Sequence, residues 1–468
     1  MARLWTRRPD LPGRVPPGPR GHPVWGSQRD FQADPLRTFD AAARRYGDIV
    51  RFRSGPAHFY LITHPDDVKH VLQDNHPNYV KGPLNDLYLK PLLGDGLLTS
   101  EGGFWLRQRR LMQPAFHRQR LAQFGAVMAD EAQATAARWR AWAERGEPFD
   151  VAEEMMRLTL TIVGKTLFST DVSSTAGEVG PALALAQAHV NYRSTHLFSL
   201  PEAVPTPRNL RFRQARATLD HVVLDMIEAR RASGEDHGDL LSMLLAARDE
   251  ETGEGMSDRQ LRDEVMTLFL AGHETTANAL AWTWYLLSEH PAQARRLREE
   301  LAHVLGGRAP TVADLPHLKY TAMVLDEALR LYPPAWTLSR SAVQADELGG
   351  YPVPARALIT LCSYSTHRHP AFWDHPDAFD PERFAPERAA ARPRYAYFPF
   401  GGGPRQCIGN NFALMEATLV LATLAQAYEV EVVPGHPIAL EPLITLRPRH
   451  GIQVRARRAA VLTAEAAP

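Results

Sequence analysis

The stretch Phe400-Gly-Gly-Gly-Pro-Arg405-Gln-Cys407-Ile-Gly409 places one cysteine in a glycine-rich loop towards the C-terminal end of the chain. A buried thiol normally behaves as a small hydrophobe, so a cysteine that binds a metal needs neighbours that favour the thiolate. The glycines let backbone N–H groups approach the sulfur, and Arg405 adds positive charge. Residues 410–427 have the pattern of a helix, whose N-terminal dipole also favours an anion. The loop therefore predicts that Cys407 is a thiolate ligand.

A lone loop cysteine is more often a packed side chain than a ligand, and the neighbours of Cys407 decide between these interpretations. The loop follows the pattern Phe-x-x-Gly-x-Arg-x-Cys-x-Gly, which resembles the haem-binding signature of the cytochrome P450 monooxygenases. A thiolate ligand donates electron density that favours O–O bond cleavage, so the resemblance implies haem b (iron protoporphyrin IX) and oxygen activation. It further implies that Phe400, Arg405 and Gly409 contact the haem and that Cys407 is the iron ligand.

Composition limits the class of protein. Lys+Arg and Asp+Glu both number 53 in a chain of 468 residues, so the charge balance does not favour nucleic acid as a partner. The only two cysteines exclude a disulfide framework and a cysteine-ligated iron–sulfur cluster, which favours a cytoplasmic location. No apolar run is long enough to predict a transmembrane helix, and residues 1–8 lack the apolar core of a signal peptide. Peripheral contact with a membrane surface remains open.

The chain shows neither an internal repeat nor a flexible linker, although its length alone would suggest two or three domains. Proline-rich stretches predict an N-terminal arm over residues 1–25 and a loop around residues 201–207. We therefore expect one mainly helical domain over residues 1–468, and a monomer. The resemblance implies the cytochrome P450 fold, a triangular helical body with a long central helix and a small β-rich portion near the N-terminus.

The pattern predicts that long central helix over residues 258–290. Ser257 and Gln260 form a capping box at its start, and Pro291 ends it after roughly 50 Å. The helix is apolar on most sides, which predicts burial. Within it, the run Ala271-Gly-His-Glu274-Thr-Thr combines a mid-helix glycine, which costs about 1 kcal/mol, with a carboxylate that needs a partner. Two such costs together indicate a functional segment.

By resemblance, this segment is the oxygen-binding groove of the same monooxygenases. Small residues such as Ala271 make room for O₂ beside the haem, Thr275 hydrogen-bonds the oxygen, and Glu274 supplies protons through water, so these last two are the predicted catalytic residues. Thr276 is expected to bond its own helix four residues earlier. The zinc-protease pattern H-E-x-x-H is excluded because position 277 is alanine. A core helix whose polar residues merely bond their neighbours is the remaining alternative.

Two further sets of residues resemble parts of the family that hold the haem. Glu327 and Arg330, with Arg383 about fifty residues later, match a Glu–Arg–Arg cluster that locks the cysteine loop, so we expect a structural role for them. Haem propionates need cationic or N–H donors. The resemblance nominates for this role Trp105, Arg109, Arg340, His367 and Arg405.

The substrate is expected to be a hydrophobic small molecule because the walls implied by the resemblance are mostly apolar. These walls are residues 79–98, 191–204, 269–271, 334–338 and 443–446. Residues 327–336 also resemble bacterial carotene-ring hydroxylases, with Trp336 covering a flat ring end. The sequence therefore predicts a hydroxylase of a carotenoid β-ring, and fatty acids and terpenoids remain open as substrates.

Electrons are expected from a ferredoxin or flavodoxin with its NAD(P)H-dependent reductase. An acidic carrier of this kind would dock on a cationic segment, unless that segment is simply a solvated face. Its arginines are Arg107, Arg109, Arg110, Arg118 and Arg120. A peroxide-driven peroxygenase is the enzymatic alternative, for which Glu274 and Thr275 would be superfluous. The non-enzymatic alternative is a haem-based sensor, which needs an output module that the sequence does not show.

Overall fold

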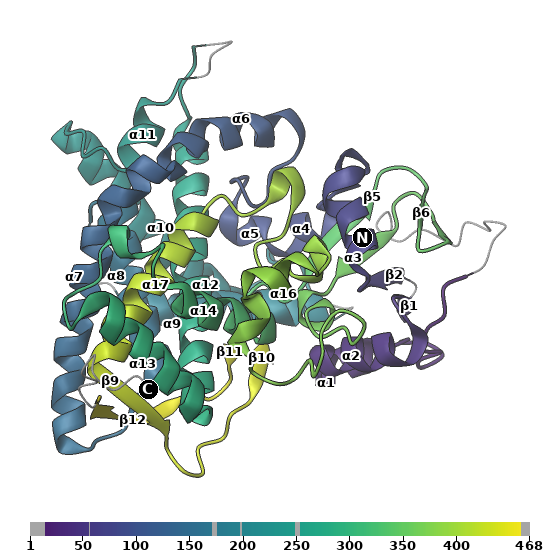
Figure 1. The fold of residues 1–468 in the computed structure, drawn as a ribbon. Helices are drawn as coiled ribbons and strands as arrows, with labels where there is room; N and C mark the ends of the chain where they lie inside the picture. Colours follow the sequence, from purple (N-terminus) through teal and green to yellow (C-terminus); the bar gives the residue numbers. More distant parts are fainter. Residues whose placement is uncertain (1–14, 56, 171–175, 197–198, 249–252, 460–468) are drawn as a thin grey trace.

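The computed structural model describes residues 15–55, 57–170, 176–196, 199–248 and 253–459. A helical body fills one side of the molecule, and a five-stranded sheet with two short helices, α1 (Gln28–Ala33) and α2 (Pro35–Tyr46), fills the other (Figure 1). The predicted mainly helical fold is confirmed, although residues 1–14 of the expected N-terminal arm lie outside the described part.

The long central helix is α12 (Asp258–Glu289), close to the predicted range. The predicted capping box forms, since the Ser257 hydroxyl accepts from the Gln260 N–H and the Gln260 side chain accepts from the Ser257 N–H. Most side chains of α12 are buried, and the helix packs along α8 (Val151–Leu167). At about 1.5 Å per residue its 32 residues cross the body, which places its midpoint deep inside the molecule.

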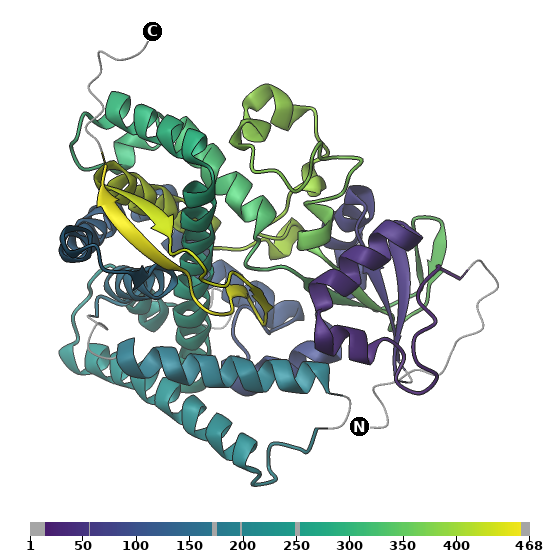
Figure 2. The same cartoon turned by 90° about the horizontal axis from the view of Figure 1, so that it is seen from below.

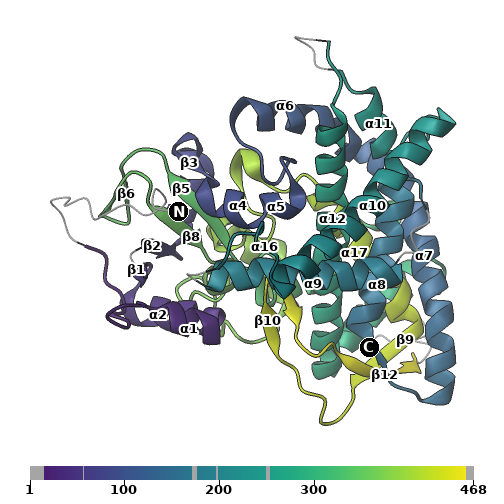
Figure 3. The ribbon, with the colours of Figure 1, turned by 180° about the vertical axis from the view of Figure 1, so that it is seen from behind.

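Figures 2 and 3 show the remaining helices around α12 from below and from behind. Among them, α9 and α10 pack against each other, and α7 packs against α17, the helix that follows Cys407. The α-helices not yet given bounds are, in chain order, α3 (Pro65–Lys69), α4 (Gly82–Tyr88), α5 (Lys90–Leu93), α6 (Gly102–Met112), α7 (Arg118–Arg145), α9 (Ala176–Thr195), α10 (Pro207–Ser233), α11 (Leu240–Ala246), α13 (Pro291–Leu305), α14 (Lys319–Leu331), α15 (Ser363–Thr366), α16 (Pro386–Ala390) and α17 (Asn410–Ala427).

The main sheet joins segments that are far apart in the sequence. Its order is β1-β2-β8-β5-β3, formed by β1 (Ile49–Ser54), β2 (Ala57–Ile62), β8 (Leu358–Leu361), β5 (Leu338–Ala342) and β3 (Tyr79–Val80). β2 and β8 run parallel with Tyr60 opposite Ile359, whereas the other pairs are antiparallel. The β-rich portion is therefore not purely N-terminal, because residues 338–361 supply two of its strands.

Three smaller sheets complete the β structure of the described residues. Three strands pair in the order β4-β12-β9, and two hairpins pair β6 with β7 and β10 with β11. Their bounds are β4 (Phe149–Asp150), β6 (Asp346–Leu348), β7 (Tyr351–Val353), β9 (Tyr428–Val432), β10 (Leu440–Pro442), β11 (Leu446–Pro448) and β12 (Gln453–Arg458). The β10–β11 hairpin matters for the site because its turn reaches α12.

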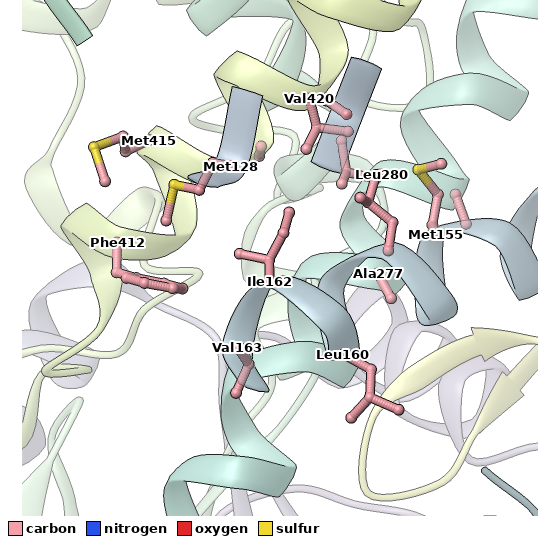
Figure 4. Close-up of a cluster of buried hydrophobic side chains, with 14 of the residues drawn as sticks. Met128, Met155, Leu160, Ile162, Val163, Ala277, Leu280, Phe412, Met415 and Val420 are labelled. Atoms are coloured by element: carbon pink, nitrogen blue, oxygen red, sulfur yellow. The ribbon is translucent and has the colours of Figure 1, made fainter. Parts of the chain in front are cut away.

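The core lies where α7, α8, α12 and α17 meet (Figure 4). Ile162 of α8 and Leu280 of α12 are fully buried there, together with Val420 of α17. Such apolar burial holds α12 and α17 in place next to the candidate site, since each fully buried aliphatic side chain contributes about 1.5–3 kcal/mol. Among the described residues, no helix combines the length and the apolar character that crossing a membrane requires.

Candidate active site

The cysteine loop is shaped by its glycines. Gly401 and Gly403 have φ angles of +68° and +64°, which other residues rarely adopt. A Cβ on Gly403 would lie 1.8 Å from the carbonyl oxygen of Leu72, in the π-helical turn η1 (His70–Asp74). The Cys407 N–H donates to the Phe400 carbonyl at 3.0 Å, which closes the loop just before α17 begins. The loop is therefore held in one conformation by contacts that only glycine permits.

The Cys407 side chain is accessible and at the same time closely surrounded by protein. The side chain is exposed to a water-sized molecule, and yet protein surrounds it closely enough for burial to raise the pKa of the thiol. The N–H of Gly409 and the charge of Arg109 oppose this rise in the pKa. We read these facts together as an internal thiol with one open side, which is what a metal ligand needs.

The middle of α12 is open in the same way. Ala271 is exposed although its neighbours Leu270 and His273 are buried, and Gly272 and Thr275 are half-buried. A Cβ on Gly272 would approach Val163 of α8 to 3.1 Å, so this glycine permits the close packing of α12 and α8. Of the predicted groove residues, Ala271 therefore lies at an open position and Thr275 is half-buried, whereas Gly272 faces α8 and Glu274 is buried.

Four cations gather beside the loop with one nearby acid. Arg109 donates to the Gln406 carbonyl at 2.7 Å, and Arg405 pairs with Glu101. Burial and the charge of Arg405 lower the pKa of Arg340 to about 10. Burial, Arg340 and Arg405 also hold the pKa of Lys81 well below its usual range.

This excess of positive charge favours a bound dianion. Trp105 packs against this cationic cluster, because the centroid of its ring lies 4.0 Å from the Arg405 guanidinium. The thiol, the open face of α12 and the cationic cluster fit a haem with two propionates, and this fit rests on Arg109, Arg340 and Arg405. Sequence reasoning missed Glu101 and Lys81 because neither stands in a recognisable motif.

The structure does not support the propionate role predicted for His367. Its ring is fully buried, Nε2 accepts from the Phe398 N–H at 2.9 Å, and the rings of Tyr397 and Phe398 pack around it. Burial and the neighbouring Arg330 and Arg368 hold the pKa of His367 well below its usual value. His367 therefore belongs to the structural cluster around Arg330 and not to the cations beside Cys407.

That structural cluster forms as predicted. Arg330 donates to both carboxyl oxygens of Glu327 at 2.6 and 2.7 Å, and Arg383 approaches Glu327 at 3.3 Å. Arg330 also donates to the carbonyls of Pro376 and Ala378. The cluster thus fastens α14 to the segment that leads into the cysteine loop, and none of its three side chains has a fully buried polar atom without a partner among the described residues, as a buried ion pair requires.

Glu274 is held more tightly than the sequence suggests. Thr445, in the turn between β10 and β11, donates to Oε1 at 2.5 Å, and Gln187 of α9 donates to Oε2. Burial raises the pKa of Glu274, and these two donors oppose the rise. The carboxyl therefore joins α12 to α9 and to the C-terminal hairpin. No motif in the sequence predicts that Gln187 and Thr445 contact Glu274, because only the fold brings these three residues together.

Both threonines of the groove bond their own helix. Thr275 Oγ1 donates to the Ala271 carbonyl at 2.9 Å, whereas Thr276 Oγ1 lies 3.5 Å from the Gly272 carbonyl. The backbone bond expected of Thr276 is therefore long, and Thr275 makes the better one. Such bonds bend a helix and occupy its carbonyls, which suits a groove.

The predicted walls are only partly open. Leu98 is 39 % exposed in the loop before α6, but Trp336 is packed against Phe39 and donates its indole N–H to the Leu443 carbonyl at 2.9 Å. The indole is thus engaged by neighbours, which weakens its predicted role as a ring cover. Residues 197–198 of the predicted wall 191–204 lie outside the described residues.

The predicted cationic segment is divided between the inside and the outside of the molecule. Arg109 is half-buried and points to the cysteine loop, whereas Arg110 and Arg120 are exposed. Arg107 reaches the carbonyl of Glu254. The side chain of Arg118 lies outside the described residues.

Comparisons with known proteins agree with this geometry. Residues 16–455 match the model of the cytochrome P450 family. The chain is 42 % identical over 92 % of its length to cyclooctatin synthase of Streptomyces melanosporofaciens, and it covers 92 % of that protein. It is 39 % identical to cyclooctat-9-en-7-ol 5-monooxygenase of the same organism, with 91 % of this chain and 92 % of the relative covered.

A plant relative and a solved structure extend the agreement. Carotene epsilon-monooxygenase of Arabidopsis thaliana is 33 % identical, with 88 % of this chain and 79 % of that protein covered. The crystal structure of the cytochrome P450DA heme domain superposes with a TM-score of 0.85 at 30 % identity, and 95 % of this chain and 98 % of that chain are covered. The chain therefore belongs to the cytochrome P450 family and is a haem b monooxygenase.

Proposed function

We propose that the protein hydroxylates a cyclic terpenoid that carries few polar groups. The observation that carries this proposal is the similarity to a relative named as a monooxygenase of cyclooctat-9-en-7-ol, a name that denotes one double bond and one hydroxyl. The exposed apolar side chains of Ala271 and Leu98, both in predicted wall or groove segments, support a substrate that binds by losing contact with water.

A carotenoid β-ring, as expected from residues 327–336, is the second candidate. The plant relative named carotene epsilon-monooxygenase favours it, but at lower identity than the two bacterial relatives. The predicted role of Trp336 as a cover for the carotenoid ring is weakened, because its indole N–H donates to the Leu443 carbonyl. We therefore rank the terpenoid first.

The proposed roles follow from where each side chain lies. Haem, when bound, supplies the activation of O₂. Cys407 would hold the iron, with Phe400 and Gly409 shaping its loop, and Arg109, Arg340, Arg405 and Trp105 would hold the propionates. Ala271 would leave room on α12, and Thr275 would offer its hydroxyl there. Glu274 would hold a proton between α12 and α9, within reach of the groove.

We also propose an acidic ferredoxin or flavodoxin as the source of electrons. Arg110, exposed on the helix whose neighbouring Arg109 reaches the cysteine loop, offers part of a docking site. Charge complementarity of this kind mainly accelerates encounter.

The experiment that tests the substrate is a ligand screen followed by turnover. Cyclic terpenoid hydrocarbons, their monoalcohols, carotenes and fatty acids would each be added to the holoenzyme while the Soret band is recorded. We expect the terpenoids to shift haem from low to high spin and to gain one hydroxyl when O₂, NAD(P)H and a surrogate carrier are supplied. Spectral shifts and products with carotenes or fatty acids alone would contradict the proposal.

A further inference from the structure

The segment that leads into the cysteine loop carries two tyrosines whose hydroxyls bond different elements. Tyr397 donates to a carboxyl oxygen of Asp326, on α14, at 2.9 Å. Tyr395, two residues earlier, donates to Oε1 of Gln73, in the π-helical turn η1, at 2.9 Å. Only 3 % of Tyr395 is exposed. The two side chains thus tie one segment to two elements that lie far from it in the sequence.

The Tyr395 hydroxyl also contacts the cysteine loop itself. It accepts from the Gly403 N–H at 3.2 Å while it donates to Gln73. A phenol hydroxyl has one proton to donate and lone pairs with which to accept, so both bonds form at the same time. The hydroxyl is therefore a bridge between η1 and a backbone amide four residues before Cys407.

The loop backbone packs closely on both partners of this bridge. A Cβ on Gly402 would clash with the ring of Tyr395, just as one on Gly403 would clash with the Leu72 carbonyl of η1. Approaches this close are possible only because glycine has no Cβ. The loop therefore rests directly on Tyr395 and on η1.

The turn η1 is itself anchored. It continues α3 in a π-helical conformation, which is rare and often occurs at functional sites. One carboxyl oxygen of Asp346, on β6, accepts from His70 Nε2 at 2.8 Å and from Asn75 Nδ2 at 2.9 Å. These bonds join both ends of the turn to β6, so η1 is a fixed base on which the loop rests.

We propose that Tyr395 is a positioning residue, which holds the cysteine loop in the geometry for iron ligation by bridging Gln73 and the Gly403 N–H. It acts on Cys407 only through the loop backbone, which the bond from the Cys407 N–H to the Phe400 carbonyl closes on either side of Gly403. Contacts behind a metal ligand fix its orientation and its electron donation. This effect on the haem rests on the proposed ligand role of Cys407, whereas the fixed position of the loop does not.

Amide hydrogen exchange of the holoenzyme, resolved to Gly403 by mass spectrometry, tests the fixed position of the loop. Y395F keeps the ring and removes the hydroxyl, and the matched control Y397F makes the same change at a hydroxyl that bonds Asp326 instead of the loop. We expect Y395F to speed exchange at Gly403 about fivefold, as the loss of one ordinary hydrogen bond does, and Y397F to change it little. Q73A removes the acceptor of the bridge and is expected to have a smaller effect in the same direction.

Spectroscopy of the same proteins tests the consequence for the haem. A thiolate that is held less firmly donates less electron density to iron. We therefore expect Y395F to raise the reduction potential and to lose the red-shifted carbon monoxide band sooner on warming. Y397F should keep both properties close to those of the natural protein even if the two variants lose equal stability.

Two results would overturn the inference: unchanged exchange at Gly403 in Y395F, or equal changes of exchange and potential in Y395F and Y397F. If Y395F does not accumulate, unchanged exchange in Q73A overturns it in the same way. A C407S protein that kept its carbon monoxide spectrum would refute the proposed ligand role and leave the exchange result intact, so the two failures are distinguishable.

Discussion

At the scale of single residues, the two cysteines offer a direct comparison. Cys407 is open on one side and Arg109 favours its thiolate, whereas Cys362 is fully buried and burial raises its pKa to about 11. We expect C407S to lose the red-shifted Soret band that carbon monoxide gives with thiolate-ligated haem, and C362S to keep it. Difference spectra of the reduced proteins check this. A C407S protein with an unchanged band would refute the ligand assignment.

Thr275 provides a test of proton delivery. Removing its hydroxyl in T275A is expected to lower product per NAD(P)H by about tenfold or more, since general-acid groups contribute about 10²–10⁴ in rate. T275S keeps the hydroxyl and is the matched control, with coupling near that of the natural protein. Product and NAD(P)H measured together give the ratio. Equal coupling in all three proteins would favour a peroxide-driven reaction, in which this hydroxyl is superfluous.

Prediction from sequence worked best for residues whose role depends on local neighbours. The hydrogen bond from the Cys407 N–H to the Phe400 carbonyl and the pairing of Arg330 with Glu327 both join residues a few positions apart, so a local sequence pattern can predict them. The misplacement of His367 has a different cause. Whether its ring faces the propionates or the Arg330 cluster depends on packing between distant segments, which one sequence does not reveal. The same holds for Gln187 as a partner of Glu274.

At the scale of elements, α12 holds the loop before α6 through two carboxylates. Glu264 accepts from the Leu97 N–H at 2.8 Å, and Asp263 accepts from the Asp95 N–H at 2.9 Å. A Cβ on Gly96 would lie 2.2 Å from the Thr267 hydroxyl oxygen, so the loop sits directly on the helix. This loop belongs to the predicted substrate wall, and the two carboxyl groups hold its backbone against α12.

Glu264 makes the stability of that contact depend on pH. Burial raises its pKa to about 8, and the Leu97 N–H and Asp263 act with smaller effects. The folded state therefore holds a proton that the unfolded chain releases above about pH 4.3, so this group lowers stability as pH rises from about 4 to 8. We expect the unfolding temperature of E264Q to fall less over this range than that of the natural protein. Thermal scans at several pH values would show parallel curves if the pKa of Glu264 were ordinary.

The bounds of long helices were predictable, and the sheet was not. Helices α12 and α17 begin and end near the predicted residues because caps, prolines and apolar patterns act within a few residues. The main sheet requires β2 to pair with β8, about three hundred residues later. No local pattern encodes such a pairing, which is why the β-rich portion was expected at the N-terminus alone.

At the scale of the whole molecule, the Glu327 cluster joins the helical body to the segment before the cysteine loop. Glu327→Ala would leave the buried Arg330 without its carboxylate, at a cost of about 3–5 kcal/mol and with loss of haem. The control is Arg388→Ala, which removes an exposed pair with Asp380 and should cost less than about 1 kcal/mol. Chemical denaturation and the ratio of Soret to protein absorbance measure both effects. Equal losses in the two variants would argue against the structural role of the cluster.

The surface charge around α6 can be tested through reduction kinetics. We expect Arg110→Glu to slow reduction by an acidic carrier at low salt and to have little effect at high salt, because exposed charges are screened. Arg213→Glu, an equal change of charge at an exposed position of α10, is the control. Stopped-flow reduction at two ionic strengths gives the comparison. A salt-independent effect, or equal slowing in both variants, would place the docking site elsewhere.

The contact between Gly403 and the Leu72 carbonyl has a consequence for biosynthesis. Residue 72 leaves the ribosome early and residue 403 late. The cysteine loop can therefore pack against the Leu72 carbonyl only when most of the chain has been made. Long-range closure of this kind is slow relative to local helix formation. Cofactor loading should accordingly be a late, post-translational event, and nascent chains stalled before the loop emerges should remain colourless.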